Sequence, residues 1–167
     1  MIFNNKMKEM MNHCGINMTL NALPDDSFPV WDKNDRYGRT YYGVDNYCGF
    51  DKRRISKDTD LSHLEWDYNE VYISSASDSE IKALILKAAG MILSWERQLK
   101  EKYPGVKFYL FASFDDGSKC ETEEGDETYK GFNMRFFAER GTGFAKEYFG
   151  CFESVDDWDQ PCIFSIC

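Results

Sequence analysis

The pattern of hydrophobic and polar positions predicts one long amphipathic helix over about residues 78–103. Apolar side chains recur there at intervals of three, four or seven residues, at Ile81, Leu84, Ile85, Ala88, Ile92, Trp95 and Leu99. This spacing places them along one face of a helix. Ser77 followed by Glu80 has the spacing of a capping box, and Tyr103-Pro104-Gly105 is a typical stop signal.

Segments rich in aromatic and β-branched residues predict strands on both sides of this helix. They are residues 70–74, 107–114, 129–138 and 162–166. In the second segment, one strand face would carry Phe108, Leu110, Ala112 and Phe114. Tyr109 and Phe111 would project from the opposite face. Both faces of the predicted sheet are therefore bulky, and we expect the aromatic N-terminal region to cover the second one.

The remaining segments complete a prediction of fold class. Residues 2–14 carry a short helical stripe that stops at Gly15, whereas residues 17–60 show no regular period and predict short strands and ordered loops. We expect an α+β fold in which a mostly antiparallel sheet packs against one long helix, with an additional short N-terminal helix. The length favours a single domain over residues 1–167.

The charge balance restricts the class of partner. Twenty Lys and Arg residues against 29 Asp and Glu give a net charge of −9. Direct binding to nucleic acid or to an anionic membrane requires basic patches, so neither is expected, and a protein partner with a basic surface is favoured. The only cationic cluster, Lys52-Arg53-Arg54, is flanked by acids and fits a solvated loop.

The cysteine pattern indicates reduced thiols. The six cysteines include no C-x-x-C pair, and the N-terminal residues lack the apolar core of an export signal. We therefore expect a cytoplasmic protein without structural disulfides. We expect neither a bound metal ion nor a cofactor, because the ligand spacings of zinc sites and EF-hands are missing.

The most distinctive feature is an acidic loop between the two aromatic strands. It contains Asp115, Asp116, Glu121, Glu123, Glu124, Asp126 and Glu127 and precedes Tyr129. A field of one sign at the end of a hairpin steers oppositely charged partners. The alternative is that the loop only keeps an aromatic hairpin soluble and protects it from edge-to-edge aggregation.

A second acidic cluster lies near the C-terminal strand. It consists of Glu153, Asp156, Asp157 and Asp159, which surround Trp158. Carboxylates around an exposed tryptophan have the composition of an interface hot spot, in which the aromatic is the anchor and the charges set the association rate. We predict that the two clusters and Tyr129 bind the partner, with Tyr41 and Tyr42 as further candidate anchors.

Catalytic chemistry has weaker support in the sequence. His63 lies among carboxylates and could work with a cysteine or a carboxylate, but no nucleophile motif accompanies it, and a solvated histidine is the simpler interpretation. Gly141-Thr-Gly143 lacks the rest of a phosphate-binding pattern and fits a turn. We therefore assign no catalytic residue.

These observations lead to a functional hypothesis. We expect a small acidic inhibitor that blocks the basic surface of a nucleic-acid enzyme, such as a nuclease, by imitating the charge of a phosphate backbone. Anti-defence inhibitors of the anti-CRISPR type and immunity proteins against nucleases work by this logic, which is an analogy of function. The alternatives are a small enzyme that uses His63 and an interaction module without inhibitory activity.

Overall fold

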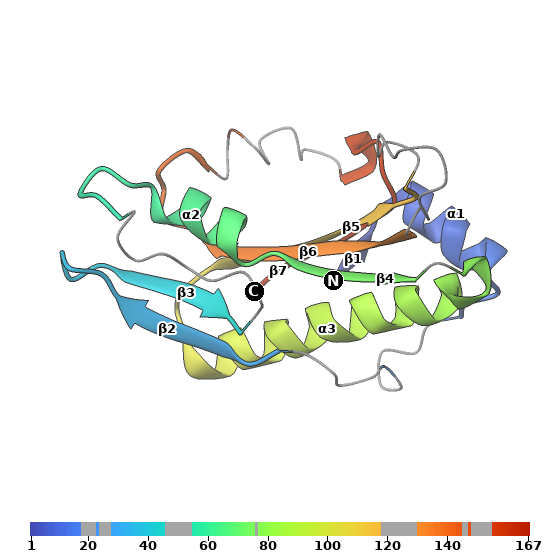
Figure 1. Ribbon diagram of the computed structural model, residues 1–167, viewed down its shortest axis with the longest axis horizontal. Coiled ribbons are helices and arrows are strands. Elements are labelled where there is room, and N and C mark those ends of the chain that lie inside the picture. Colours follow the sequence, from blue (N-terminus) through green and yellow to red (C-terminus); the bar gives the residue numbers. More distant parts are fainter. Residues whose placement is uncertain are drawn as a thin grey trace.

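The computed structural model describes residues 1–17, 23, 28–45, 55–75, 77–117, 130–144, 147 and 155–167. Its centre is an antiparallel sheet of five strands in the order β1-β7-β5-β6-β4 (Figure 1). The strands are β1 (Ile2–Phe3), β4 (Val71–Ser75), β5 (Phe108–Asp115), β6 (Lys130–Ala138) and β7 (Cys162–Ile166). Three α-helices and a separate two-stranded hairpin surround this sheet in the part of the chain that is described, which confirms the α+β prediction.

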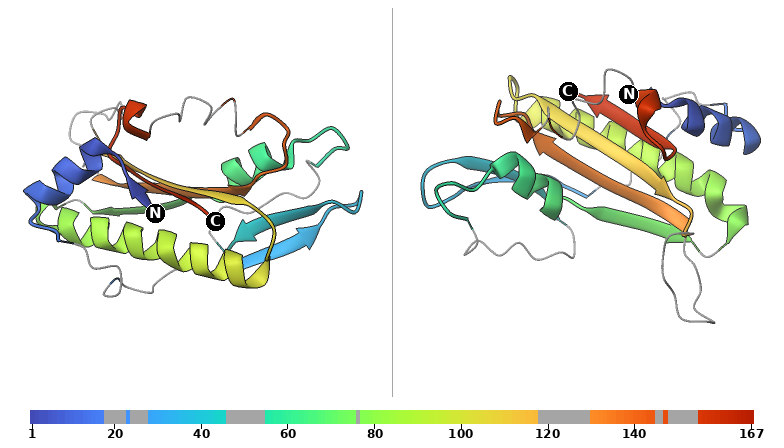
Figure 2. Two further views of the ribbon diagram at one scale, coloured as in Figure 1. Left: turned by 180° about the vertical axis from the view of Figure 1, so that it is seen from behind. Right: turned by 90° about the horizontal axis from the view of Figure 1, so that it is seen from above.

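The long helix α3 (Ile81–Lys102) covers one face of the sheet, as the periodicity predicts (Figures 1 and 2). Its apolar stripe is buried: Ile85, Ala88, Ile92, Trp95 and Leu99 have no solvent-accessible surface. The facing sheet positions Phe108, Leu110, Ala112 and Phe114 belong to the same core. The alternation read from the sequence is therefore correct for this face.

The start of α3 differs from the predicted capping box. A short 3-10 turn, η3 (Asp78–Glu80), precedes the helix, and Glu80 is its N-cap without a side-chain capping bond. The Glu80 carboxylate instead accepts a hydrogen bond from the Ser75 hydroxyl. Ser77 bonds to Ser79 through their hydroxyls, so the capping-box prediction is wrong. The side chains of Ser77 and Glu80 therefore bond to serine hydroxyls and not to the helix amides.

The opposite face of the sheet carries a second, aromatic core. Phe111, Phe137, Phe144, Cys162 and Phe164 are buried there, with Trp66, Tyr109, Val155 and Trp158 packed around them. Trp66 belongs to α2 (Leu61–Tyr68), a helix that the sequence pattern did not reveal. Figure 1 shows α2 on the side of the sheet that lies away from α3. Both faces of β5 are therefore covered. The expectation that the N-terminal region covers the second face is wrong, because the described residues packed there come from α2 and from the C-terminal part of the chain.

The hairpin of β2 (Val30–Asn34) and β3 (Thr40–Val44) extends beyond the end of the sheet (Figure 1). Its turn is fixed by Asp35, whose carboxylate accepts hydrogen bonds from the N–H groups of Tyr37 and Arg39. This hairpin confirms the short strands expected within residues 17–60.

The N-terminal helix α1 (Asn5–His13) follows β1 and ends before Gly15, which has a positive φ of 61°. Glycine adopts this backbone conformation without the strain that a Cβ would add, so it is a suitable helix terminator. Within the described segments, no helix is both long enough and apolar enough to cross a membrane.

Candidate functional site

The structure brings the described parts of the two acidic segments to the same end of the sheet. The N–H of Phe114, near the end of β5, donates a 2.9 Å hydrogen bond to the carbonyl of Pro161, just before β7. Because the two strands are antiparallel, the residues after Phe114 and those before Pro161 lie beside each other. We call this region the acidic end, defined by Asp115, Asp116, Asp156, Asp157 and Asp159.

Asn4 holds the second of these segments in position. Its side chain is buried and donates a 2.8 Å hydrogen bond to the carbonyl of Gln160. Its Oδ1 accepts hydrogen bonds from the N–H of Met7, at 2.9 Å, and from that of Cys162, at 3.0 Å. One side chain thus caps α1 and fixes the entry into β7, which restrains the chain that carries Asp156 to Asp159.

The carboxylates of the acidic end differ in their local contacts. Asp156 accepts a 2.7 Å hydrogen bond from the N–H of Asn5, at the start of α1, and Asp115 accepts one of 2.9 Å from Gly117. Asp159 lies 3.6 Å from the ammonium group of Lys6. Asp116, Asp156, Asp157 and Asp159 are all exposed, so these four carboxylates are accessible to a partner.

The remaining residues of the two predicted clusters, and Tyr129, lie outside the described segments: Glu121, Glu123, Glu124, Asp126, Glu127, Tyr129 and Glu153. The chain on either side of residues 118–129 is described. It leaves β5 after Asp115 and re-enters β6 at Lys130, and Asp115 is paired with Gly131. Both attachment points of this acidic segment are therefore at the acidic end.

Trp158 does not have the exposed position that its role as an anchor requires. It is half-buried, and its ring packs edge-on against Phe111, with centroids 4.9 Å apart and an interplanar angle of 70°. Tyr41 is 2% exposed and lies in the small core under the hairpin. The prediction of exposed anchors is wrong for both residues, because the sheet face and the hairpin each need apolar cover.

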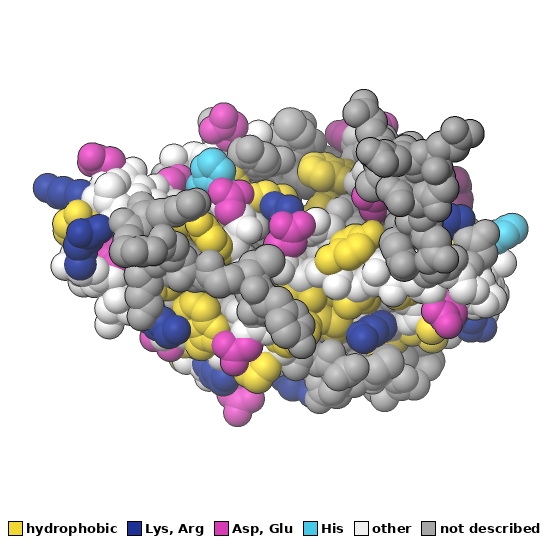
Figure 3. All heavy atoms as spheres, viewed as in Figure 1, with side chains coloured by type: hydrophobic (Ala, Val, Ile, Leu, Met, Phe, Trp, Pro, Cys, Tyr) yellow, Lys and Arg dark blue, Asp and Glu magenta, His cyan; other side chains and the backbone are white. Residues whose placement is uncertain are grey.

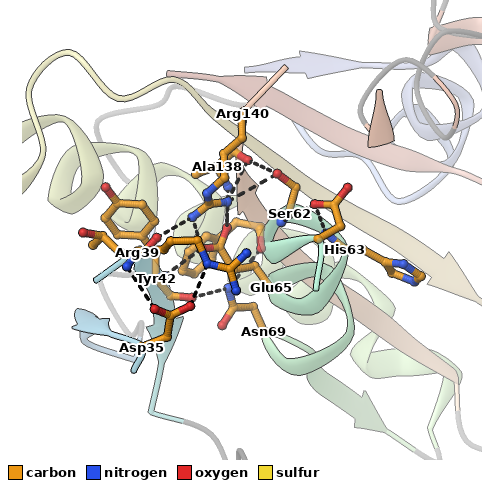
Figure 4. A network of polar contacts seen from close by, with 12 residues as sticks. Asp35, Arg39, Tyr42, Ser62, His63, Glu65, Asn69, Ala138 and Arg140 are labelled. Atoms are coloured by element: carbon orange, nitrogen blue, oxygen red, sulfur yellow. Dashed lines mark hydrogen bonds and ion pairs between the residues drawn. The ribbon is translucent and has the colours of Figure 1, made fainter. Parts of the chain in front are cut away.

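His63 lies on α2 and is half-exposed. Its ring stacks on Phe144 at 5.0 Å, and its Nε2 is 3.5 Å from a carboxylate oxygen of Asp67, one helical turn away. Figure 4 shows the imidazole pointing away from the polar network of Glu65 and Arg140. Among the residues that are described, no group of three His, Cys, Asp or Glu side chains is arranged to hold a metal ion.

The described cysteines are free thiols: Cys14, Cys162 and Cys167. Burial raises the pKa of Cys162 to about 11, and burial likewise raises the pKa of Cys167 to about 11. A thiol is nucleophilic as the thiolate, so these two groups are poor nucleophiles near neutral pH.

The main polar network of the fold joins Glu65 to Arg140 (Figure 4). Both carboxylate oxygens are engaged by the guanidinium, at 2.5 Å and 2.9 Å, and Glu65 is buried on α2. Its carboxylate also accepts 2.7 Å hydrogen bonds from the N–H groups of Tyr42 and Ala138. Helix α2, the hairpin strand β3 and the end of β6 therefore meet at one charged pair.

Two neighbouring side chains extend this network. Ser62 donates a 2.7 Å hydrogen bond to the carbonyl of Ala138, and Asn69 donates to the carbonyls of Tyr42 and Phe136. Burial raises the pKa of Glu65, while Arg140 and the two N–H groups act in the opposite direction. The polar groups are mutually satisfied, which is the arrangement of a structural clamp.

The sequence contains no local signal for this clamp. Glu65 and Arg140 are 75 residues apart, and each is one of many charged residues. If residues 61–68 had been predicted as a helix, Glu65 would have shared the core-facing side of that helix with Leu61. Glu65 would then have been recognised as a buried carboxylate that needs a cation.

Comparisons with protein-family models, curated protein sequences and solved structures give no match for this chain.

Proposed function

We propose that this chain is a small acidic inhibitor that binds a protein partner through the acidic end and blocks the basic, nucleic-acid-binding surface of an enzyme. The partner class is a nuclease or another nucleic-acid enzyme, in an anti-defence or a nuclease-immunity setting. We place this activity in the cytoplasm. The inhibitor itself carries out no catalytic step.

One observation carries the proposal: the Phe114–Pro161 hydrogen bond brings acidic residues that are some 40 positions apart in the chain to one end of a sheet. A rigid scaffold that presents several carboxylates in one direction produces a focused negative field. Such a field increases the association rate with a basic groove and competes with a phosphate backbone for it.

The revised position of Trp158 changes how affinity would arise. Since its ring packs against Phe111, Trp158 helps to hold the acidic end on the sheet instead of serving as an exposed anchor. Exposed carboxylates then supply steering, and the ordered backbone reduces the entropy lost on binding. Interfaces dominated by charge of this kind weaken strongly with salt.

A capture experiment with matched variants tests the proposal. The wild-type protein is immobilised and exposed to host lysate at low and at physiological salt, and the captured nucleic-acid enzymes are identified and assayed for inhibition. The test variant replaces Asp116, Asp157 and Asp159 by Asn. The control variant makes the same change in net charge at exposed acids elsewhere, with Asp45→Asn, Asp58→Asn and Glu101→Gln.

The expected result is that the test variant loses capture and inhibition while the control variant retains both. Added nucleic acid should release the captured enzyme. Equal capture by both variants would show that the acidic end is not the binding surface. Capture without inhibition would instead support the interaction module that the sequence leaves open.

A further inference from the structure

The two edges of the five-stranded sheet are protected to different degrees. At one edge, β1 contains only two residues and is followed at once by Asn4 and α1. At the other edge, β4 extends over five residues and pairs only with β6 among the described strands. Figure 2 shows β4 as the outermost strand on its side of the sheet.

The residues of strand β4 themselves carry none of the protective side chains that are usual in an edge strand. Its sequence, Val-Tyr-Ile-Ser-Ser, contains no proline and no charged residue. Natural edge strands commonly use lysine, proline or a bulge to prevent pairing with another chain. Tyr72 and Ser74 are exposed, Tyr72 by 47%. Figure 3, drawn in the view of Figure 1, shows hydrophobic side chains at the surface on the face of the molecule that is turned to the reader.

We propose that β4 pairs antiparallel with β4 of a second copy of this chain, so that the two sheets become one continuous sheet. This inference is independent of the proposed function, because the acidic end takes no part in the pairing. A two-fold axis at Ile73 would bring Tyr72 of each copy opposite Ser74 of the other. Such a contact is self-complementary, as a two-fold interface must be.

Charge distribution favours a second copy as the occupant. An uncharged strand that pairs with itself brings no like charges into opposition, although the whole chain carries a net charge of −9. Glu70, just before β4, is already paired with Arg135 at 3.1 Å. A basic peptide would therefore find no carboxylate on β4 itself.

The direction of pairing also separates the acidic ends. Ser74 pairs with Gly131, which in turn pairs with Asp115, so the C-terminal end of β4 points toward the acidic end. In an antiparallel pair of β4 strands, the acidic ends of the two copies lie at opposite extremities of the dimer. Their mutual repulsion is then screened by distance and salt.

The orientation of the Tyr72 side chain makes this residue a useful probe of pairing at the β4 edge. A Cβ added to Gly131 would come within 2.9 Å of the Tyr72 ring, so this ring lies over the neighbouring strand. In the dimer it would be covered from the side by the second copy. Tyr72→Lys removes the ring that the second copy would cover and adds one cation to each copy at symmetric positions.

Sedimentation analysis of the full chain over a wide concentration range tests the pairing. The wild-type protein should pass from monomer to dimer, and the amides of Val71–Ser75 should gain protection from hydrogen exchange as the dimer forms. Tyr72→Lys and Ser74→Lys should each raise the dimer dissociation constant at least about tenfold. Tyr37→Lys is the matched control, since Tyr37 is 46% exposed on the distant hairpin, and it should leave the constant unchanged.

Several outcomes would overturn the proposal. They are a wild-type protein that stays monomeric at every concentration, and a dimer that Ser74→Lys leaves intact. Ser74 is exposed, so this variant keeps the test valid if Tyr72→Lys unfolds. Protection of β4 by another molecule while the chain stays monomeric would assign the edge to a different occupant. Neutralising Asp116, Asp157 and Asp159 should not affect dimer formation.

Discussion

Glu65 and Arg140 form a two-point ion pair that joins α2 to the end of β6 and to the hairpin. The carboxylate is nearly inaccessible, at 1% of its side-chain surface, whereas the guanidinium retains 20%. A buried charge of this kind is tolerated because its partner and the main-chain N–H groups replace the lost water. The pair therefore fixes the relative position of three elements that are distant in sequence.

Removing the cation should be strongly destabilising and dependent on pH. Arg140→Met leaves the Glu65 carboxylate buried with no cation, and we expect a loss of about 3–5 kcal/mol near neutral pH. Without Arg140, burial raises the folded-state pKa of Glu65 further above its unfolded value. The folded state then holds the proton more tightly, so stability is retained below the unfolded pKa and is lost as pH rises through the folded one.

Urea unfolding of Arg140→Met in acidic and neutral buffer measures this effect. Arg135→Met is the control, because its pair with Glu70 is partly exposed and should contribute less. Equal destabilisation of Arg140→Met at both pH values would contradict a buried, titrating Glu65.

Truncation of Trp95 should test the core under α3. Its ring is fully buried, packs against Phe136 at 5.4 Å and donates a 3.0 Å hydrogen bond to the carbonyl of Phe28. We expect Trp95→Ala to lower the free energy of unfolding by about 3–5 kcal/mol, as measured by urea titration. A loss below about 1 kcal/mol would be inconsistent with a buried stripe.

Asn4 should be important for stability despite its position near the terminus. Asn4→Ala leaves the N–H groups of Met7 and Cys162 without their side-chain acceptor, at a cost of about 1–3 kcal/mol. Asn5→Ala is the adjacent control, and its exposed side chain should change stability by less than about 0.5 kcal/mol. Thermal unfolding of both variants compares them, and equal melting temperatures would refute the structural role of Asn4.

Thiol labelling should distinguish buried from accessible cysteines. In the folded protein, Cys162 and Cys167 should react slowly, and their rates should rise with pH toward a pKa of about 11. After denaturation without reductant, nearly all six cysteines should react. Mass spectrometry after labelling checks both points, and two or three native disulfides would contradict the proposed cytoplasmic location.

The acidic segment after β5 should govern association rate more than stability. Replacing Glu121, Glu123, Glu124, Asp126 and Glu127 by Gln or Asn should leave the unfolding midpoint nearly unchanged, because the sequence predicts a solvated loop here and substitutions in such loops usually cost less than about 0.5 kcal/mol each. Binding to a captured target should become slower and less dependent on salt. Unchanged kinetics in a stopped-flow or surface-binding assay would leave this segment with a solubilising role.

Local periodicity was sufficient to predict the elements in which apolar side chains repeat at a regular interval along the sequence. The apolar stripe of α3 and the two faces of β5 follow from side chains that repeat within a few residues, and both predictions are confirmed. The same reasoning missed α2, because Leu61, Glu65 and Trp66 contact different partners and give this short helix no single apolar face. It also predicted an exposed Trp158, although this residue is half-buried and its ring packs against Phe111.

The sequence by itself determined the composition of the acidic segments, the long helix and the class of fold. Only the tertiary structure decided that Phe114 meets Pro161, that Asn4 fixes the entry into β7 and that Glu65 meets Arg140. The physical reason is the range of the interactions. Helix and strand periods are fixed by local backbone geometry, whereas strand register and buried ion pairs depend on contacts between distant segments that form only when the whole core packs.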